Sequence, residues 1–260
     1  MEIPFDMDED GLVPSVTPRF AVVESASATL PRHLRGGTGD DIATSTTEDD
    51  MRFDEDADDK LDPALVAELH HEFQRQQQQR GAGAKQTLTP PENFAPVIDT
   101  IYRSSFPQPA NFEFLKTLRL KSVLCLIPEE YPDVQQQFLD DNGIRLFQLG
   151  MSGNKEPFVI ISAELITEAA KIVLNPANHP ILIHCNRGKH RTGCLVGVLR
   201  RLQQWSLSLI FDEYRKFAAP KERSMDQQFI ELYNDAAIRT YALDHGWLPL
   251  LWDSAGDAIS

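Results

Sequence analysis

The most informative segment of the chain is residues 181–193, Ile-Leu-Ile-His-Cys-Asn-Arg-Gly-Lys-His-Arg-Thr-Gly. The run that ends at His184 is short and almost wholly apolar, which is typical of a strand buried on both faces of a parallel sheet. Residues 185–190 are polar and contain a glycine, which predicts a loop. An amphipathic pattern begins near Arg191 and predicts a helix. The segment therefore predicts a strand, a loop and a helix in direct succession.

A loop in that position can bind an anion. Its amide N–H groups can turn inward, and the N-terminus of the following helix points to the same place, so both favour negative charge. Cys185 is the first residue of this loop. Helix N-termini and nearby cations stabilise thiolates, and a thiolate facing a phosphate can attack phosphorus. The Arg191 guanidinium can fork onto two phosphate oxygens. We predict that Cys185 is the nucleophile and that Arg191 stabilises the transition state.

Three neighbouring residues are expected to support this chemistry. Gly188 allows backbone angles that other residues resist. The Thr192 hydroxyl is expected to donate to the Cys185 sulfur and stabilise it as a leaving group. His184 is expected to orient the loop by hydrogen bonding. The alternative is a structural thiol beside solvated cations. It is disfavoured because Cys185, Arg191 and Thr192 occur together between a predicted strand and a predicted helix.

Strands and helices are predicted to alternate from about residue 91 onward. The predicted strands include residues 122–127, 144–149 and 180–184, and the predicted helices include 111–120, 134–141, 161–174 and 224–237. This alternation predicts an α/β domain with a central sheet. We place this domain at residues 91–241. A C-terminal tail is assigned to 242–260, in which Trp247, Leu251 and Trp252 are expected to pack on the domain.

The acidic residues of the chain are concentrated in its first third. Residues 1–90 hold 19 acidic and 8 basic side chains, whereas residues 91–260 hold 20 and 17, within a total charge of −14. Such a composition cannot bury enough apolar surface to order a chain. We expect residues 1–90 to be a largely disordered tail and linker, with a short helix within 61–80. The tail is a solvated spacer, a protein-binding segment or a target of phosphorylation.

Composition also excludes several function classes. A net-acidic chain disfavours binding to nucleic acid or to an anionic membrane surface. No stretch approaches 18 apolar residues, and the acidic N-terminus lacks the features of a signal peptide. The three cysteines have no metal-ligand spacing and suit a reducing compartment. We therefore expect a cytoplasmic protein, with the nucleus as an open alternative.

The loop sequence HCNRGKHRTG resembles the H-C-x5-R-[ST]-G loop of Cys-dependent tyrosine and dual-specificity phosphatases. The blocks NFAPVIDTIYRSSFPQPANFEFL and IRLFQLGMSGNKEPF are similar to the plant and fungal atypical dual-specificity phosphatases, which cleave inositol pyrophosphates. The resemblance spans about residues 91–234. It implies a mostly parallel five-stranded sheet flanked by helices, and neither a metal nor another cofactor. It also implies that the substrate phosphate is the 5-β-phosphate of a diphosphoinositol polyphosphate.

The cations near Cys185 favour a small substrate that carries several phosphates. They are Arg187, Lys189 and His190 in the loop and Lys155 in the GNKEPF segment. Asn186 and Asn154 are also expected to contact the substrate. The alternative for the cationic side chains is that they face solvent.

The predicted site also needs a general acid that protonates the leaving group. No Asp occurs between Asp141 and Cys185, so Glu156 of GNKEPF is the predicted acid, and a structural ion pair is its alternative. Asp226 is a second candidate. A phosphate leaving group is less basic than a serine alkoxide and needs less protonation.

Two alternative functions remain open at this stage. The first is a phosphatase that acts on phosphotyrosine or other phosphoproteins. The second is a phosphate-binding scaffold that works through its acidic tail, although a scaffold needs no nucleophile.

Overall fold

The computed structural model describes residues 67–68, 71, 74–75, 88–155 and 159–250. At the centre of the region from residue 88 onward lies a five-stranded sheet with the strand order β1-β2-β5-β3-β4. The strands are β1 (Ala95–Ile98), β2 (Ile101–Ser104), β3 (Ser122–Cys125), β4 (Arg145–Gln148) and β5 (Ile181–His184). Only the β1–β2 pair is antiparallel among these strands. The predicted α/β fold with a mostly parallel sheet is confirmed.

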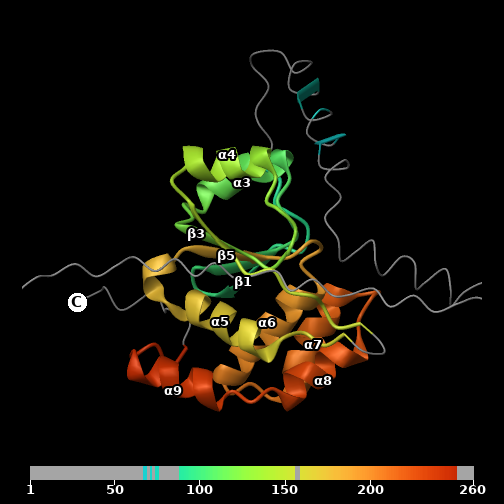
Figure 1. The fold of residues 1–260 in the computed structure, drawn as a ribbon, viewed down its shortest axis with the longest axis vertical. Helices are drawn as coiled ribbons and strands as arrows, with labels where there is room; N and C mark the ends of the chain where they lie inside the picture. The colour runs from blue at the N-terminus through green and yellow to red at the C-terminus, as the bar shows by residue number, and fades with distance from the viewer. Residues whose placement is uncertain (1–66, 69–70, 72–73, 76–87, 156–158, 251–260) are drawn as a thin grey trace, which may run out of the picture. The chain divides into compact units, whose positions relative to one another are not determined.

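Helices cover both faces of the sheet (Figure 1). One face carries α3 (Phe112–Thr117) and α4 (Asp133–Asp141). The other face carries the remaining helices, which are α5 (Ala163–Leu174), α6 (His190–Leu202), α7 (Leu207–Ala218), α8 (Ser224–Leu232) and α9 (Ala236–Asp244). Two short 3₁₀ turns, η1 (Pro109–Asn111) and η2 (Pro176–Asn178), complete the described elements.

The central strand β5 sets the position of the functional loop. All four of its residues are 0 % exposed, because it lies between β2 and β3 and is covered on both faces. Its last residue, His184, pairs in register with Ser104 of β2 and Cys125 of β3. The carboxyl ends of the three strands therefore meet at one edge, where open α/β sheets bind their ligands.

The bounds of the predicted helices differ from those observed: the helix predicted at 111–120 is α3, Phe112–Thr117, and that predicted at 134–141 is α4, Asp133–Asp141. The helix predicted at 161–174 begins at Ala163, because the Ser162 hydroxyl accepts a hydrogen bond from Leu165 N at 3.1 Å and caps it. The single helix predicted at 224–237 is wrong. It is two helices, α8 and α9, because Tyr233 is extended and the Asn234 side chain accepts from Ala236 N at 3.1 Å.

The two ends of the chain are described only in part. Between positions 61 and 80, the described residues 67–68, 71 and 74–75 are helical, and of the rest of the predicted acidic tail the structure describes only residues 88–90. The boundary that we placed at residue 241 falls inside α9. Beyond α9, Trp247 packs against the core as predicted, whereas Leu251 and Trp252 lie outside the described part. No helix within the described ranges is long and apolar enough to cross a membrane.

Candidate active site

Cys185 lies directly after β5, at the carboxyl edge of the sheet. The loop of residues 185–189 joins β5 to α6, which begins at His190. Both predicted catalytic side chains are buried: Cys185 is 3 % exposed and Arg191 is 2 % exposed. The strand, the loop and the helix predicted from residues 181–193 are all confirmed.

The carbonyl oxygens of the loop all accept hydrogen bonds from surrounding protein groups. The pairs are Cys185 O with His184 Nδ1 at 3.3 Å, Asn186 O with Phe106 N at 2.8 Å, Arg187 O with Asn93 Nδ2 at 2.8 Å, Gly188 O with Arg103 Nη2 at 2.6 Å, and Lys189 O with Gly193 N at 2.9 Å. In a trans peptide the N–H points away from the preceding C=O. The amides of residues 186–190 therefore face the opposite, inner side of the loop, where they can donate to a phosphate.

Gly188 is the tightest point of this loop. Its φ is +68°, in the left-handed region that favours glycine. A Cβ at this position would lie 2.5 Å from Ser104 O, at the end of β2. The loop therefore rests directly on the backbone of β2, and glycine is required there both for its φ and for its lack of a side chain.

Arg103 of β2 is a buried cation behind the loop. It is 1 % exposed, donates from Nη2 to Gly188 O, and lies over the Phe217 ring with 3.9 Å from Cζ to the ring centroid. Burial lowers the pKa of Arg103 to about 10, so its guanidinium is still charged at neutral pH. A charged donor makes a stronger hydrogen bond than a neutral one. Arg103 therefore both fixes the loop carbonyl and adds positive charge near the anion site.

Arg191 and Thr192 occupy the first turn of α6. The guanidinium of Arg191 is held at the sheet edge, with Nη1 3.4 Å from both Leu126 O and Met151 O. Thr192 is 0 % exposed, and its Oγ1 makes no hydrogen bond to any described residue. The hydroxyl is thus available for the Cys185 sulfur, and that contact stays a prediction.

His184 is a neutral, oriented imidazole. Burial lowers the pKa of His184 to about 4; the hydrogen bond to Cys185 O acts against this shift, and the nearby Arg191 charge contributes to it. A carbonyl oxygen can only accept, so Nδ1–H donates to Cys185 O. The other nitrogen, Nε2, must then accept, and Tyr131 Oη lies 3.3 Å from it. The orienting role predicted for His184 has a defined geometry, which fixes the first carbonyl of the loop.

The loop cations lie in different surroundings. His190 Nε2 donates to Lys221 O at 2.6 Å, and Lys189 Nζ donates to Ala219 O at 3.2 Å, so both side chains tie the loop to the α7–α8 connection. Arg187 is the most open, with half of its side chain exposed and Nη1 4.0 Å from Glu92 Oε2. Contact of these three residues and of Asn186 with a substrate stays a prediction.

The GNKEPF segment only partly matches the sequence prediction. Lys155 is half-buried and forms a β-bridge with Val159. Asn154, which we predicted to contact substrate, is 1 % exposed and bonds inside the protein, because its amide donates to Asp226 Oδ1 at 2.7 Å. Glu156, the predicted general acid, lies outside the described residues. Asp226, the second candidate acid, is 0 % exposed and already bonded, so it has no open path to a leaving group.

The two remaining cysteines are buried free thiols. Burial raises the pKa of Cys125 to about 12. Burial and the nearby Asp226 carboxyl raise the pKa of Cys194 well above its usual value. Both thiols therefore stay protonated at neutral pH, which disfavours a role for either of them as a redox partner of Cys185.

Sequence reasoning missed three residues that hold the loop: Asn93, Arg103 and Tyr131. Arg103 carried a usable signal, because it is a charged residue inside an otherwise strand-like run and a buried charge requires a partner. Asn93 and Tyr131 carried none, because only the fold brings their segments to the loop.

Residues 88–249 match the tyrosine phosphatase family. The chain belongs to this family. Inositol diphosphatase SIW14 of Saccharomyces cerevisiae is 57 % identical to this family member over 201 residues, which cover 77 % of this chain and 70 % of the relative. Inositol diphosphatase DSP1 of Oryza sativa subsp. japonica is 57 % identical over 152 residues, which cover 58 % of this chain and 68 % of the relative.

Solved structures agree with this assignment to the phosphatase family. The core catalytic domain of the PP-IP phosphatase SIW14 from S. cerevisiae, crystallised with citrate, is 60 % identical and superposes with a TM-score of 0.61. The match covers 64 % of this chain and 100 % of that chain. The resemblance to atypical dual-specificity phosphatases that the sequence indicated is confirmed, and so is the implied five-stranded fold.

Proposed function

We propose that this chain is a Cys-dependent phosphatase that hydrolyses inositol pyrophosphates, with the 5-β-phosphate as the group removed. The observation that carries the phosphatase activity is the loop from Cys185 to Lys189, in which every carbonyl is bonded outward and the amides face the anion site. The substrate class is supported by the relatives named inositol diphosphatase. It is also supported by the cations beside the loop, because a substrate with several phosphates gains from each of them.

The first step transfers the phosphoryl group to sulfur. Cys185 Sγ attacks the terminal phosphorus, an S–P bond forms, and the P–O bond to the bridging oxygen breaks. The electron pair of that bond stays on the inositol phosphate that leaves. The inward amides and the Arg191 guanidinium neutralise the charge on the equatorial oxygens. In this step Thr192, the residue after Arg191, donates to the sulfur.

The second step hydrolyses the cysteinyl-phosphate. A water oxygen attacks phosphorus, the S–P bond breaks, and the electron pair returns to sulfur, releasing inorganic phosphate.

Protonation of the leaving group of the first step is least demanding for a phosphate, because its oxygen is far less basic than an alkoxide. The described residues thus favour anhydrides and aryl phosphates over phosphoserine. Neither step requires a metal ion, since Arg191 and the amides supply the positive charge.

Phosphate release from a substrate panel tests the proposal. The panel contains diphosphoinositol pentakisphosphate, inositol hexakisphosphate, a phosphotyrosine peptide and a phosphoserine peptide, assayed with and without EDTA. We expect the diphosphate to have the highest kcat/KM and EDTA to have no effect. Equal turnover of inositol hexakisphosphate, or strong inhibition by EDTA, contradicts the proposal.

A second candidate activity is hydrolysis of phosphotyrosine in proteins. It is favoured by the description of the matched family and by a Dictyostelium discoideum relative named probable tyrosine-protein phosphatase DG1060. That relative is 46 % identical over 161 residues, which cover 62 % of this chain and 96 % of the relative. A higher kcat/KM on the phosphotyrosine peptide than on the diphosphate selects this activity. Absence of turnover on every ester and anhydride leaves the phosphate-binding scaffold.

A further inference from the structure

A segment rich in small and polar residues runs from the sheet edge to Lys155. We call residues 150–155 the Lys155 segment. It begins beside the reacting centre, because Met151 O lies 3.4 Å from Arg191 Nη1. It ends in the β-bridge, where Lys155 N donates to Val159 O at 2.8 Å and Val159 N donates to Lys155 O at 2.9 Å. The Lys155 segment therefore runs from the Arg191 guanidinium to the β-bridge, and its position sets where the backbone of Lys155 lies relative to the Cys185 loop.

Asn154 fastens this segment to the helical layer. Its side-chain oxygen accepts from Ile161 N at 2.7 Å, and its side-chain nitrogen donates to Asp226 Oδ1 at 2.7 Å. Its backbone oxygen accepts from Arg223 Nη1 at 3.0 Å. One residue next to Lys155 thus holds both sides of the β-bridge and links them to α8.

Asp226 is the fixed point at the other end of this link. It lies in the first turn of α8 and is 0 % exposed, which is rare for a carboxyl group. Its Oδ2 accepts from Tyr214 Oη at 2.6 Å, while its Oδ1 accepts from Asn154. Both of its oxygens are thus used inside the protein. Nothing in the two phosphoryl-transfer steps uses this carboxyl, although its burial is costly.

Tyr214 connects the same carboxyl to the catalytic helix. A Cβ added to Gly193 would lie 2.9 Å from the Tyr214 ring, so α6 packs against this ring one residue after Thr192. The Tyr214 hydroxyl also accepts from Arg223 N at 3.1 Å. The hydrogen bonds therefore join α7, α8 and the Lys155 segment through one buried carboxyl, and α6 packs against the Tyr214 ring.

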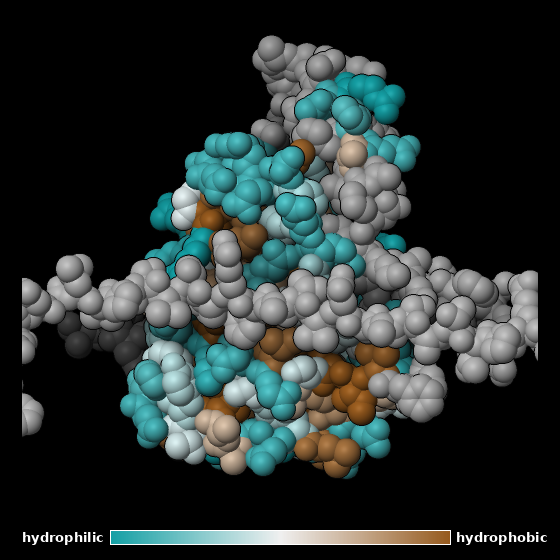
Figure 2. Space-filling view, in the orientation of Figure 1, coloured by the Kyte–Doolittle hydropathy of each residue, from teal (hydrophilic) through white to brown (hydrophobic). Residues whose placement is uncertain are grey.

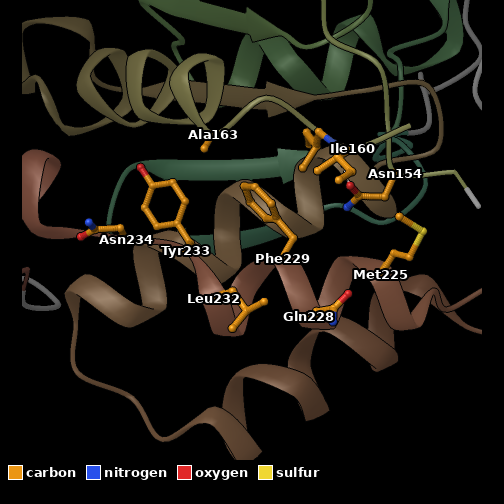
Figure 3. A pocket seen from close by; sticks show the side chains of 10 residues that line it. Asn154, Ile160, Ala163, Met225, Gln228, Phe229, Leu232, Tyr233 and Asn234 are labelled. Carbon is orange, nitrogen blue, oxygen red and sulfur yellow. Dashed lines mark hydrogen bonds between the residues drawn. The ribbon is translucent and has the colours of Figure 1, made fainter. Parts of the chain in front are cut away.

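Apolar packing between α8 and the segment after Val159 is incomplete. A cleft of about 400 Å³ opens there, with Asn154 at its edge, Ile160 on one side, and Phe229 and Leu232 of α8 on the other (Figure 3). The side chains at its rim are open to solvent, with Ile160 69 % exposed and Leu232 72 % exposed. The space-filling view likewise shows hydrophobic surface over this helical layer (Figure 2). The Lys155 segment is therefore attached to α8 more by the hydrogen bonds of Asp226 than by buried apolar contacts.

We propose that Asp226 is a positioning residue for substrate selection: through Asn154 it holds Lys155 where it binds a phosphate of the substrate that lies outside the Cys185 loop. The proposal rests on the proposed function and names a determinant of its preference for polyphosphates. A small aryl phosphate fills only the Cys185 loop. Turnover of an aryl phosphate is therefore insensitive to substitution of Asp226, whereas binding of an inositol polyphosphate is sensitive to it.

The test compares Asp226→Asn, Lys155→Ala and the double variant, with para-nitrophenyl phosphate as substrate and inositol hexakisphosphate as competitive inhibitor. Asn at position 226 has a single acceptor oxygen, so it can accept from only one of the two groups that now donate to Asp226. We expect each single variant to raise the inhibition constant about ten-fold, which is the effect of one lost charged contact. We expect the kcat of Asp226→Asn for the aryl phosphate to change less than about two-fold.

The double variant separates positioning from general damage. If Asp226 acts through Lys155, the double variant has the inhibition constant of Lys155→Ala alone. A further rise in the double variant overturns the proposal, and so does an equal loss of aryl phosphate turnover in Asp226→Asn. Asp235→Asn is the matched control, because it removes a carboxyl at the start of α9 that pairs with Arg239 at 2.8 Å and, among the described residues, makes no hydrogen bond with the Lys155 segment.

A compensating double variant adds a measurement, the inhibitor affinity, that would not change if Asp226 had only a structural role. In Asn154→Asp/Asp226→Asn the amide and the carboxyl exchange places, so donors and acceptors match again. We expect this pair to recover inhibitor affinity relative to Asp226→Asn. Recovery of thermal stability without recovery of affinity contradicts the proposal. If Asp226→Asn does not fold, Tyr214→Phe takes its place in the same cycle, because it removes the donor to Asp226 Oδ2 together with the acceptor of Arg223 N.

The inhibition assay does not depend on pyrophosphate hydrolysis. Failure of the proposed function is a wild-type enzyme that releases no phosphate from diphosphoinositol pentakisphosphate. Failure of the present inference is an unchanged inhibition constant in Asp226→Asn. The two failures are therefore seen in different measurements.

Discussion

The hydroxyl of Tyr131 lies 3.3 Å from Nε2 of His184, in the interior of the domain. His184 is 0 % exposed and Tyr131 is 8 % exposed, so neither group can exchange this partner for bulk water. Because Nδ1–H of His184 is committed to Cys185 O, the Tyr131 hydroxyl must donate to Nε2. A residue from the connection after β3 therefore selects the tautomer that holds the first loop carbonyl.

Replacing Tyr131 with Phe is expected to loosen this carbonyl without removing any catalytic group. Loss of one neutral hydrogen bond is worth about 1 kcal/mol, or roughly a five-fold fall in kcat, with KM nearly unchanged. Nitrogen-15 chemical shifts of His184 should show a loss of the fixed Nδ1–H tautomer. Tyr233→Phe is the matched control, because the Tyr233 hydroxyl bonds Thr167 Oγ1 at 2.6 Å and does not touch the loop. An unchanged kcat together with an unchanged tautomer contradicts this role of Tyr131.

The buried His184 also predicts a dependence of stability on pH. Its pKa is lowered by burial to about 4, against 6.5 in the unfolded chain, so the unfolded state binds more protons between these values. The stabilisation is complete above pH 6.5 and is lost as the pH falls toward 4, by about 3 kcal/mol at most. Urea unfolding of wild type and His184→Asn between pH 7 and pH 4 measures the difference. If the free energy of unfolding depends on pH equally in the two proteins, His184 is not the group responsible for the pH dependence.

The strand, loop and helix of the site could be predicted because their signals are local. The apolar run before His184 and the amphipathic pattern after Arg191 each depend only on residues that are close together in the sequence. The end of α8 could not be predicted in this way. An apolar pattern continues through residues 224–237, and the break depends on a single extended residue, Tyr233.

The support of the loop could not be predicted, because it comes from segments distant in sequence. Arg103 is 85 residues from Gly188, and Asn93 is 94 residues from Arg187, although each pair is hydrogen-bonded. Asn154 illustrates the opposite error. Its place beside Lys155 favoured a substrate contact, but its side chain is used to hold Asp226. Polar residues near a site can bind either the ligand or the frame, and only the packing distinguishes them.

Replacing Arg103 with Met tests the support of Gly188 from β2. Met keeps most of the buried volume over Phe217 but removes the donor and the charge. A buried carbonyl left without its partner costs about 1–3 kcal/mol, so we expect roughly a ten-fold or larger loss of kcat/KM. Thermal unfolding of the same variant reports how much of that cost falls on the whole fold. Full activity would show that Gly188 O does not need Arg103. Arg215→Met is the control, because its guanidinium bonds Asp212 at 2.6 Å on the exposed side of α7.

Cys185→Ser separates binding from chemistry. The amides of residues 186–190 and the Arg191 guanidinium bind phosphate in the absence of the thiol, so inositol hexakisphosphate should bind this variant nearly as tightly as wild type. Turnover should be abolished, because a serine hydroxyl is not ionised at neutral pH and no described base lies ready to activate it. Isothermal titration and phosphate release measure the two properties on one sample. Cys194→Ala is the control, since Cys194 is a buried thiol of α6 whose raised pKa keeps it protonated, and its activity should persist. Phosphate release by Cys185→Ser at a rate near that of wild type contradicts the cysteinyl-phosphate mechanism.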